Sequence, residues 1–228
     1  MFLIMKNNIC DTVVRLLHNG ENPWTGYKVG TTNFHNSWGS TEPCFEHFIK
    51  ELRPQLVIEV GSFLGGSAIH MADMLEESGL ENRCIICVDT WLAEEVLWSR
   101  PDERKLLKIE HGSPTFYYTF LNNVEFSGHS DTIIPLRMPS LSAGRYLKMK
   151  GIRAPFIYID GSHIQGDVWA DLNMYWDLLL PGGVMLIDDF SNEENGIFDG
   201  VIKDATTFAA MNDLKLEVWN KKAFIRKP

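Results

Sequence analysis

Two acidic segments in the second half of the chain carry the residues best suited to chemistry. Asp160 ends one apolar run and is followed three residues later by His163, while Asp188 and Asp189 end the next apolar run. If both runs are neighbouring buried strands, the three carboxylates meet at one edge of a sheet. Carboxylates a few ångströms apart resist joint ionisation unless a cation compensates their charge. A hard divalent ion that binds oxygen ligands is the expected solution.

A glycine-containing turn follows the first predicted strand and leads directly into a helix. Its pattern, E-x-G-x-x-x-G-x-S, differs from the G-x-G-x-x-G of dinucleotide-binding proteins and from a phosphate loop with its terminal lysine. Glycine lets a ligand approach the backbone closely, and the helix N-terminus offers amide donors to an anionic group. The residues predicted to contact a cofactor at this turn are Glu59, Gly61, Ser62, Gly65 and Ser67.

The second strand ends in Asp89, about thirty residues farther on, where a carboxylate can accept both hydroxyls of a ribose. Taken alone, Asp89 could equally cap a turn. We also assign Thr90 and Trp91 to the cofactor site, although Trp91 could instead belong to the core. Together, the glycine turn and Asp89 indicate a nucleoside cofactor at the carboxyl edge of the first strands.

The elements that must position these residues are typical of an α/β fold. Apolar runs alternate with helical patterns from Leu56 onward, which predicts a doubly wound, Rossmann-like, mostly parallel sheet that is covered on both faces. Seven strands are expected at 56–60, 84–89, 132–136, 156–160, 184–188, 215–219 and 222–226. The last two lie close together across Asn220 and predict an antiparallel hairpin. We divide the single expected domain into an N-terminal helical cap segment, 1–55, and a main part, 56–228.

Three predictions concern helices and the longest connection. Thr41 is expected to cap a helix with Pro43 in its first turn. A second helix is expected from Val168 to Leu179, ended by the Pro-Gly-Gly that follows. The aromatic connection 90–131 is long enough to build a lid or binding wall, although a helix pair that merely packs on the sheet is an equal alternative.

Charge and composition argue against several classes of partner and of targeting segment. A net charge of -9 and a pI near 5.2 argue against nucleic acid or an anionic membrane as a partner, because the mean field repels phosphate. The basic residues Lys221, Lys222, Arg226 and Lys227 are interpreted as the solvated end of an edge strand. The apolar start breaks at Lys6, too early for a signal peptide, and no stretch has the length of a membrane span.

The four cysteines do not suggest a disulfide scaffold, so a reducing cytoplasm is the expected location. Cys84 and Cys87 form a C-x-x-C inside a predicted strand, where residues three apart point to opposite faces. They cannot share a metal ion there, and we predict two buried strand cysteines.

From Leu56 to its C-terminus, the chain resembles the class I S-adenosylmethionine-dependent methyltransferases. The glycine turn, Asp89 and the Leu-Leu-Pro-Gly-Gly at 179–183 carry this resemblance. More narrowly, Ile-Asp-Gly-Ser-His at 159–163 and Ile-Asp-Asp-Phe at 187–190 are similar to metal-dependent O-methyltransferases that act on sugar hydroxyls of macrolides and related natural products.

The resemblance implies S-adenosylmethionine as the cofactor and Asp160, Asp188 and Asp189 as metal ligands, with Mg²⁺ the default ion. It implies that His163 is the general base and that Ser140, after the third strand, bonds to adenine; a turn serine is the alternative. Asp160 is expected to act in catalysis, or could instead contact only the amino group of the cofactor.

We therefore predict an O-methyltransferase for a hydroxyl of a small molecule. An aliphatic hydroxyl has a pKa of roughly 15 to 16, so it needs a base or a cation before it can attack a sulfonium. His163, with an ordinary pKa of about 6.5, could accept its proton near neutral pH, or could instead be a helix-start histidine or a further metal ligand.

The alternatives are a metal-independent methyltransferase, in which Asp188 and Asp189 only cap the following loop, and a non-catalytic cofactor-binding protein. His35, Trp38 and Ser40 could close over the cofactor. The acceptor and any assembly into a homo-oligomer are left open.

Overall fold

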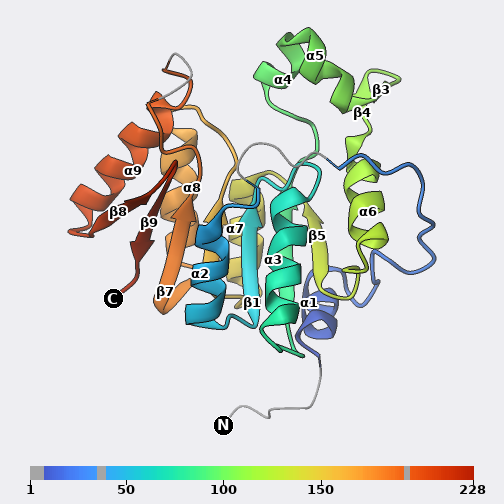
Figure 1. Cartoon of the computed structure of the whole chain (residues 1–228), viewed down its shortest axis with the longest axis horizontal. Coiled ribbons are helices and arrows are strands. Elements are labelled where there is room, and N and C mark those ends of the chain that lie inside the picture. Colours follow the sequence, from blue (N-terminus) through green and yellow to red (C-terminus); the bar gives the residue numbers. More distant parts are fainter. Residues whose placement is uncertain (1–7, 35–39, 193–195) are drawn as a thin grey trace.

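The computed structural model describes residues 8–34, 40–192 and 196–228. Its centre is a seven-stranded sheet in the order β5-β2-β1-β6-β7-β9-β8, in which neighbours from β5 to β7 are parallel and β9 is antiparallel to both β7 and β8 (Figure 1). The predicted doubly wound α/β fold with an antiparallel C-terminal hairpin is confirmed. Its strands are β1 (Leu56–Val60), β2 (Cys84–Asp89), β5 (Ile133–Arg137), β6 (Ala154–Ile159), β7 (Leu179–Ile187), β8 (Leu216–Trp219) and β9 (Lys222–Arg226).

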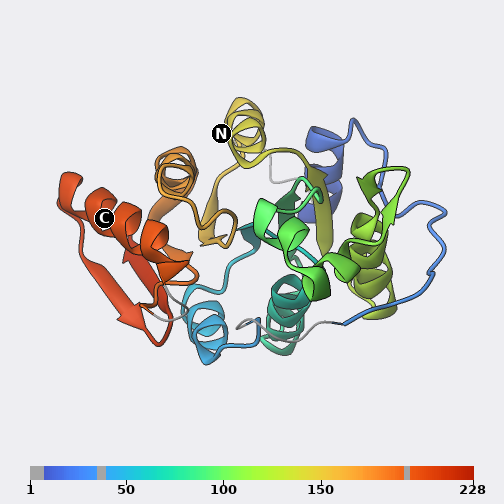
Figure 2. The same ribbon diagram turned by 90° about the horizontal axis from the view of Figure 1, so that it is seen from above.

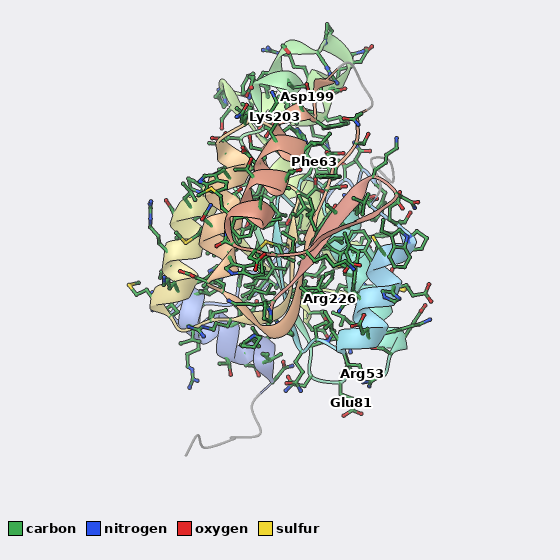
Figure 3. All side chains as sticks on the ribbon, turned by 90° about the vertical axis from the view of Figure 1, so that its left-hand side faces the viewer. Arg53, Phe63, Glu81, Asp199, Lys203 and Arg226 are labelled. Carbon is green, nitrogen blue, oxygen red and sulfur yellow. The ribbon has the colours of Figure 1, made fainter. Side chains whose placement is uncertain are left out.

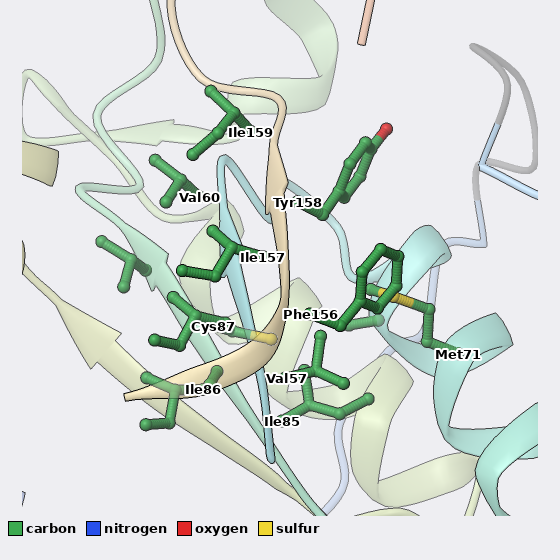
Figure 4. Packing of buried hydrophobic residues seen from close by; sticks show 14 of the residues in the cluster. Val57, Val60, Met71, Ile85, Ile86, Cys87, Phe156, Ile157, Tyr158 and Ile159 are labelled. Carbon is green, nitrogen blue, oxygen red and sulfur yellow. The ribbon is translucent and has the colours of Figure 1, made fainter. Parts of the chain in front are cut away.

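The central strands are mostly apolar because both faces of the sheet are covered; the exceptions are Glu59 in β1 and Asp89 at the end of β2. Phe156 and Tyr158 point from β6 to the face that carries Met71, whereas Ile157 and Ile159 point to the other face (Figure 4). Cys84 and Cys87 are both fully buried in β2 and unpaired, which confirms the prediction of two buried strand cysteines.

Helices form a layer on each face of the sheet. Figure 2 shows α2 and α3 on one face and α7, α8 and α9 on the other. The helices of these two layers are α2 (Pro43–Leu52), α3 (Gly66–Glu77), α7 (Ser140–Met149), α8 (Asp167–Trp176) and α9 (Asp199–Met211). The N-terminal α1 (Ile9–Leu17) lies beside β5, where Cys10 Sγ is 3.4 Å from the Thr132 carbonyl oxygen. The division at residue 55 falls in the turn between α2 and β1.

Two predicted helix ends are wrong. The N-cap of α2 is Glu42 rather than Thr41, because Pro43 takes the first helical position, where its missing N–H is not needed. The helix α8 ends at Trp176, and Leu179 already belongs to β7. The Pro-Gly-Gly at 181–183 therefore does not end a helix. It forms an irregularity inside β7, opposite a register shift between Ala154 and Phe156 of β6, with Pro181 and Gly182 exposed and Gly183 buried.

The long connection after β2 divides into two parts. Its second part, α6 (Phe116–Phe126), is a single helix rather than the helix pair of the packing alternative, and its buried Phe116 and Phe120 contact the rings of Phe63 and Trp91. Its first part rises above the carboxyl edge of the sheet at the top of Figure 1 and consists of α4 (Glu95–Ser99), α5 (Pro101–Arg104), η1 (Lys105–Leu107), β3 (Ile109–Glu110) and β4 (Ser113–Pro114). We call residues 90–114 the cover segment.

The interpretation of the C-terminal basic residues as a solvated edge is wrong for Lys222. Strand β9 lies between β7 and β8 and is not an edge, and the Lys222 side chain is only 1% exposed. Arg226, labelled in Figure 3, forms a bidentate ion pair with Glu51 on α2, with Nη1 2.6 Å from Oε1. Figure 3 also shows Phe63 toward the carboxyl edge of the sheet, and Arg53 and Glu81 at the opposite end.

Within the described residues, no helix is both long enough and apolar enough to cross a membrane.

Candidate active site

A cavity of about 790 Å³ opens at the carboxyl edge of the parallel strands, below the cover segment. It brings together several predicted site residues that are distant in sequence, and these are Gly61, Asp89, Thr90, Ser140, Asp160, His163, Asp188 and Asp189. The cover segment contributes Glu94, Val96, Leu97, Arg100 and Glu103 to the same wall. The cavity is therefore bounded by the strand ends below and by the cover segment above.

The glycine turn is built so that the backbone can line the cavity. Gly61 has φ +87°, and a Cβ there would lie 1.7 Å from the carbonyl oxygen of Asp160, so only glycine fits. Glu59 lies fully buried beneath the turn, where its carboxylate accepts hydrogen bonds from Ser62 Oγ (2.7 Å) and Ser67 Oγ (2.5 Å). These bonds tie the strand end to both sides of the turn, which explains the spacing of the motif. Burial raises the pKa of Glu59 above its ordinary value.

Asp89 fixes the other side of the same turn. Its Oδ2 accepts the backbone N–H groups of Ser62 (3.0 Å) and Phe63 (2.9 Å), and its Oδ1 accepts that of Trp91 (2.7 Å). Oδ2 already accepts two N–H groups, so the lone pair that remains is on Oδ1. Asp89 lines the cavity and is therefore still able to accept a ligand hydroxyl. Trp91 itself does not face the cavity, because its ring is fully buried against Tyr117 and Phe120.

Asp188 is paired with a buried lysine. Lys222 Nζ donates to Asp188 Oδ1 and lies 3.1 Å from the Tyr158 hydroxyl, which in turn contacts Asp188 Oδ2 and lies 3.1 Å from Asp160 Oδ2. Burial alone lowers the pKa of Lys222, but the carboxylates of Asp188 and Asp160 outweigh it and raise the pKa. Lys222 therefore supplies a cation inside the acidic cluster.

Asp189 points to a different partner. Its backbone is in the left-handed region, with φ +53°, which turns its side chain toward the loop after β6. Asp189 Oδ2 lies 2.8 Å from Nε2 of His163, and Glu94 Oε2 of the cover segment lies 3.2 Å from Nδ1 of the same ring. The start of α8 is held by Asp204 on α9, which accepts the backbone N–H of Gly166 (2.6 Å), so the loop that carries His163 is anchored on both sides.

The charges of this cluster shift its pKa values strongly. Burial lowers the pKa of His163, but its hydrogen bonds to Asp189 and Glu94 outweigh burial and raise the pKa to about 10. Burial raises the pKa of Asp160 well above its usual range, and repulsion from Asp188 adds to the effect. In this arrangement, with no cation in the site, His163 carries a proton at neutral pH, where an imidazole with the ordinary pKa of 6.5 would be mostly neutral.

The donor set fits a divalent cation. One ligand atom each from Asp160, His163 and Asp189 lies within 4.8 Å of the others, which is close enough for one ion to reach all three. Asp188, the remaining predicted ligand, is instead engaged by Lys222. Two carboxylates and an imidazole suit Mn²⁺ or a similar ion as well as Mg²⁺.

Sequence reasoning missed Glu94 and Lys222. Ser140, which was predicted, begins α7 and lines the cavity. Ser40 Oγ is buried without a hydrogen-bond partner among the described residues and does not line the cavity, and His35 and Trp38 lie outside those residues.

Comparisons with known proteins show the family and the fold of this chain. A family model described as "Methyltransferase domain" matches residues 58–190. An O-methyltransferase from Bacillus cereus in complex with S-adenosylhomocysteine superimposes with a TM-score of 0.57 and 15% identity, covering 99% of this chain and 93% of that chain. The calicheamicin-biosynthesis enzyme CalS11, described as a TDP-rhamnose 3'-O-methyltransferase, gives a TM-score of 0.52 at 14% identity and covers 80% of this chain and 75% of its own.

A curated relative is the uncharacterized protein y4gI of Sinorhizobium fredii, which is 22% identical over 197 residues. The match includes 82% of this chain but only 20% of y4gI, so the chain spans about a fifth of the length of that relative.

Proposed function

Because this chain belongs to the methyltransferase-domain family and has the fold of class I S-adenosylmethionine-dependent methyltransferases, we propose that it transfers the methyl group of S-adenosylmethionine to a hydroxyl of a small molecule. A divalent cation bound at Asp160 and Asp189 would assist the transfer. The observation that carries this proposal is the convergence of the glycine turn, Asp89 and the Asp160–His163–Asp189 group on one cavity. A hydroxyl of a sugar is the favoured acceptor, by analogy with the sugar-modifying CalS11.

In this proposal the parts of the cavity have distinct tasks. The backbone at Gly61 lets the cofactor approach the end of β1, and Asp89 accepts a ribose hydroxyl at Oδ1. The acidic cluster then faces the sulfonium end, where its negative charge stabilises a positively charged donor. Val96 and Leu97 of the cover segment lie over the cavity and would exclude water from the acceptor.

A divalent ion bound at this site would lower the pKa of the acceptor hydroxyl and orient it. His163 would accept the proton of that hydroxyl on its ring. Glu94 and Asp189 raise the pKa of His163, so the ring is protonated at neutral pH and cannot act as a base. A cation shared by Asp160 and Asp189 would lower this pKa, because its positive charge offsets that of the carboxylates, and His163 could then accept a proton.

The test is calorimetric titration with S-adenosylhomocysteine, with Mn²⁺ or Mg²⁺ and again with a chelator, followed by methyl transfer from labelled S-adenosylmethionine to a panel of nucleotide sugars, glycosides and catechols. Micromolar cofactor binding and chelator-sensitive transfer are expected. Absence of cofactor binding under both conditions would refute the proposal.

A second candidate is a metal-independent methyltransferase, and the buried Lys222 favours it. Its ammonium already neutralises Asp188, so the cluster needs less compensation from an added ion. Methyl transfer that is unchanged by a chelator would select this second candidate.

A further inference from the structure

Asp171 is a buried carboxylate in the cavity wall that the proposed reaction does not use. It lies on α8, is 3% exposed, and lines the cavity together with Ser140 and Gly161. Its Oδ1 has no hydrogen-bond partner among the described residues, and its Oδ2 lies 3.4 Å from the position that a Cβ at Gly161 would occupy. Leaving a buried acceptor unpaired is costly, so a ligand that supplies a donor is the natural explanation.

The sheet order indicates which end of the cofactor reaches Asp171. Asp89 on β2 marks the ribose, and the acidic cluster on β6 and β7 marks the sulfonium. The base must therefore extend from β2 away from β6 and β7, toward the turn between β5 and α7, where Met138 and Ser140 line the cavity. Helix α8 reaches this turn, because it packs beside α7 (Figure 2) and its Tyr175 hydroxyl donates to the Ser140 carbonyl oxygen at 2.8 Å.

The chemistry of the two groups is complementary. An ionised carboxylate can only accept hydrogen bonds, and the distinctive donor of adenine is its exocyclic 6-amino group. Burial raises the pKa of Asp171 to about 6, while a hydrogen bond from Ser140 opposes the rise, so Asp171 is ionised at neutral pH.

We propose that Asp171 selects the adenine base of the cofactor by accepting a hydrogen bond from the 6-amino group at Oδ1. This inference rests on the proposed use of S-adenosylmethionine. It places recognition of the base on α8, which was not among the segments predicted to contact the cofactor.

The experiment compares S-adenosylhomocysteine with S-inosylhomocysteine, in which a carbonyl oxygen replaces the 6-amino group. Calorimetric titrations are run at roughly pH 7.5, where the carboxyl group is ionised. The proteins are the wild type, Asp171→Asn and a matched control, Asp177→Asn. The control makes the same change at an exposed position at the end of the same helix, where Asp177 pairs with Lys148.

The wild type and Asp177→Asn are expected to bind the adenine compound at least about tenfold more tightly, because the carboxylate repels the carbonyl oxygen. Asp171→Asn should lose most of this preference, since its amide accepts from an amino group and donates to a carbonyl. Unchanged preference in Asp171→Asn, or equal weakening of both compounds, would overturn the inference and leave the proposed function standing.

The wild type alone gives a second test that needs no variant. If it binds both compounds equally, Asp171 does not select the base although the cofactor is bound. If it binds neither compound, the proposed function fails and the inference fails with it.

Discussion

Lys222→Met removes the ammonium that balances Asp188 while keeping most of the side-chain volume. Lys222 is 1% exposed and Asp188 is 6% exposed, so the variant leaves a buried carboxylate without its cation. Breaking a buried pair from one side costs about 3 to 5 kcal/mol. For a chain of this size each kcal/mol shifts the melting temperature by about 2 to 4 °C, so a loss of roughly 6 to 20 °C is expected.

The assay is thermal and urea unfolding in a chelator, so that no ion can replace the lysine. The control is Lys215→Met, which breaks the exposed Lys215–Glu217 pair and should change the free energy of unfolding by less than about 1 kcal/mol. The double variant Lys222→Met/Asp188→Asn should recover much of the loss, because no unpaired charge remains. A loss in Lys222→Met no larger than in the control would refute the pairing of Lys222 with Asp188.

Three further outcomes follow from the acidic cluster. Asp189→Asn should abolish metal-supported methyl transfer and leave binding of S-adenosylhomocysteine near the wild-type value; full activity on a genuine acceptor would contradict the metal site. His163→Gln should lower kcat by about 10² to 10⁴ fold and leave Mn²⁺ affinity unchanged if His163 is a base, whereas a large loss of Mn²⁺ affinity would make it a ligand. The folded-state pKa of His163 is raised from 6.5 to about 10, so its ion pairs stabilise the fold fully below about pH 6.5 and lose their effect as pH rises toward 10. Glu94→Gln should therefore lower the melting temperature in a chelator at pH 6 and have little effect near pH 10; a difference that does not vary with pH would rule out the Glu94–His163 pair.

The sheet could be predicted from sequence because its strands are short apolar runs with clear boundaries. The runs at Leu56–Val60 and Cys84–Asp89 match the observed strands at both ends. The prediction failed at the Pro-Gly-Gly of 181–183, because these residue types usually end a helix. They instead lie inside β7, where the exposed irregularity is compatible with Gly182 in the left-handed region, at φ +77°.

The residues of the glycine turn were recognised, but their individual tasks could not be. The spacing of Glu59 and Ser67 is equally compatible with a carboxylate that touches the cofactor and with one that holds the turn from below. Only the burial of Glu59 and its hydrogen bonds from Ser62 and Ser67 place it beneath the turn. Glu94 was missed because its contact with His163 spans a connection whose path over the sheet has no sequence signal.

Lys222, by contrast, could have been found by combining charge with topology. Three carboxylates at one edge of a sheet require compensation of their charge, which a cationic side chain can supply as well as an added ion. A last strand that runs antiparallel begins at the edge where the parallel strands end, so the first residues of β9 must lie beside Asp188. The basic residue at that position is then a candidate counter-ion. Its side chain is buried because it lies over the rings of Phe45 on α2 and Tyr158 on β6. Lys222 also lowers the affinity that we expect the site to have for divalent ions. An ion that binds at Asp160 and Asp189 enters a cluster in which Asp188 is already neutralised, so removal of Lys222 should raise that affinity.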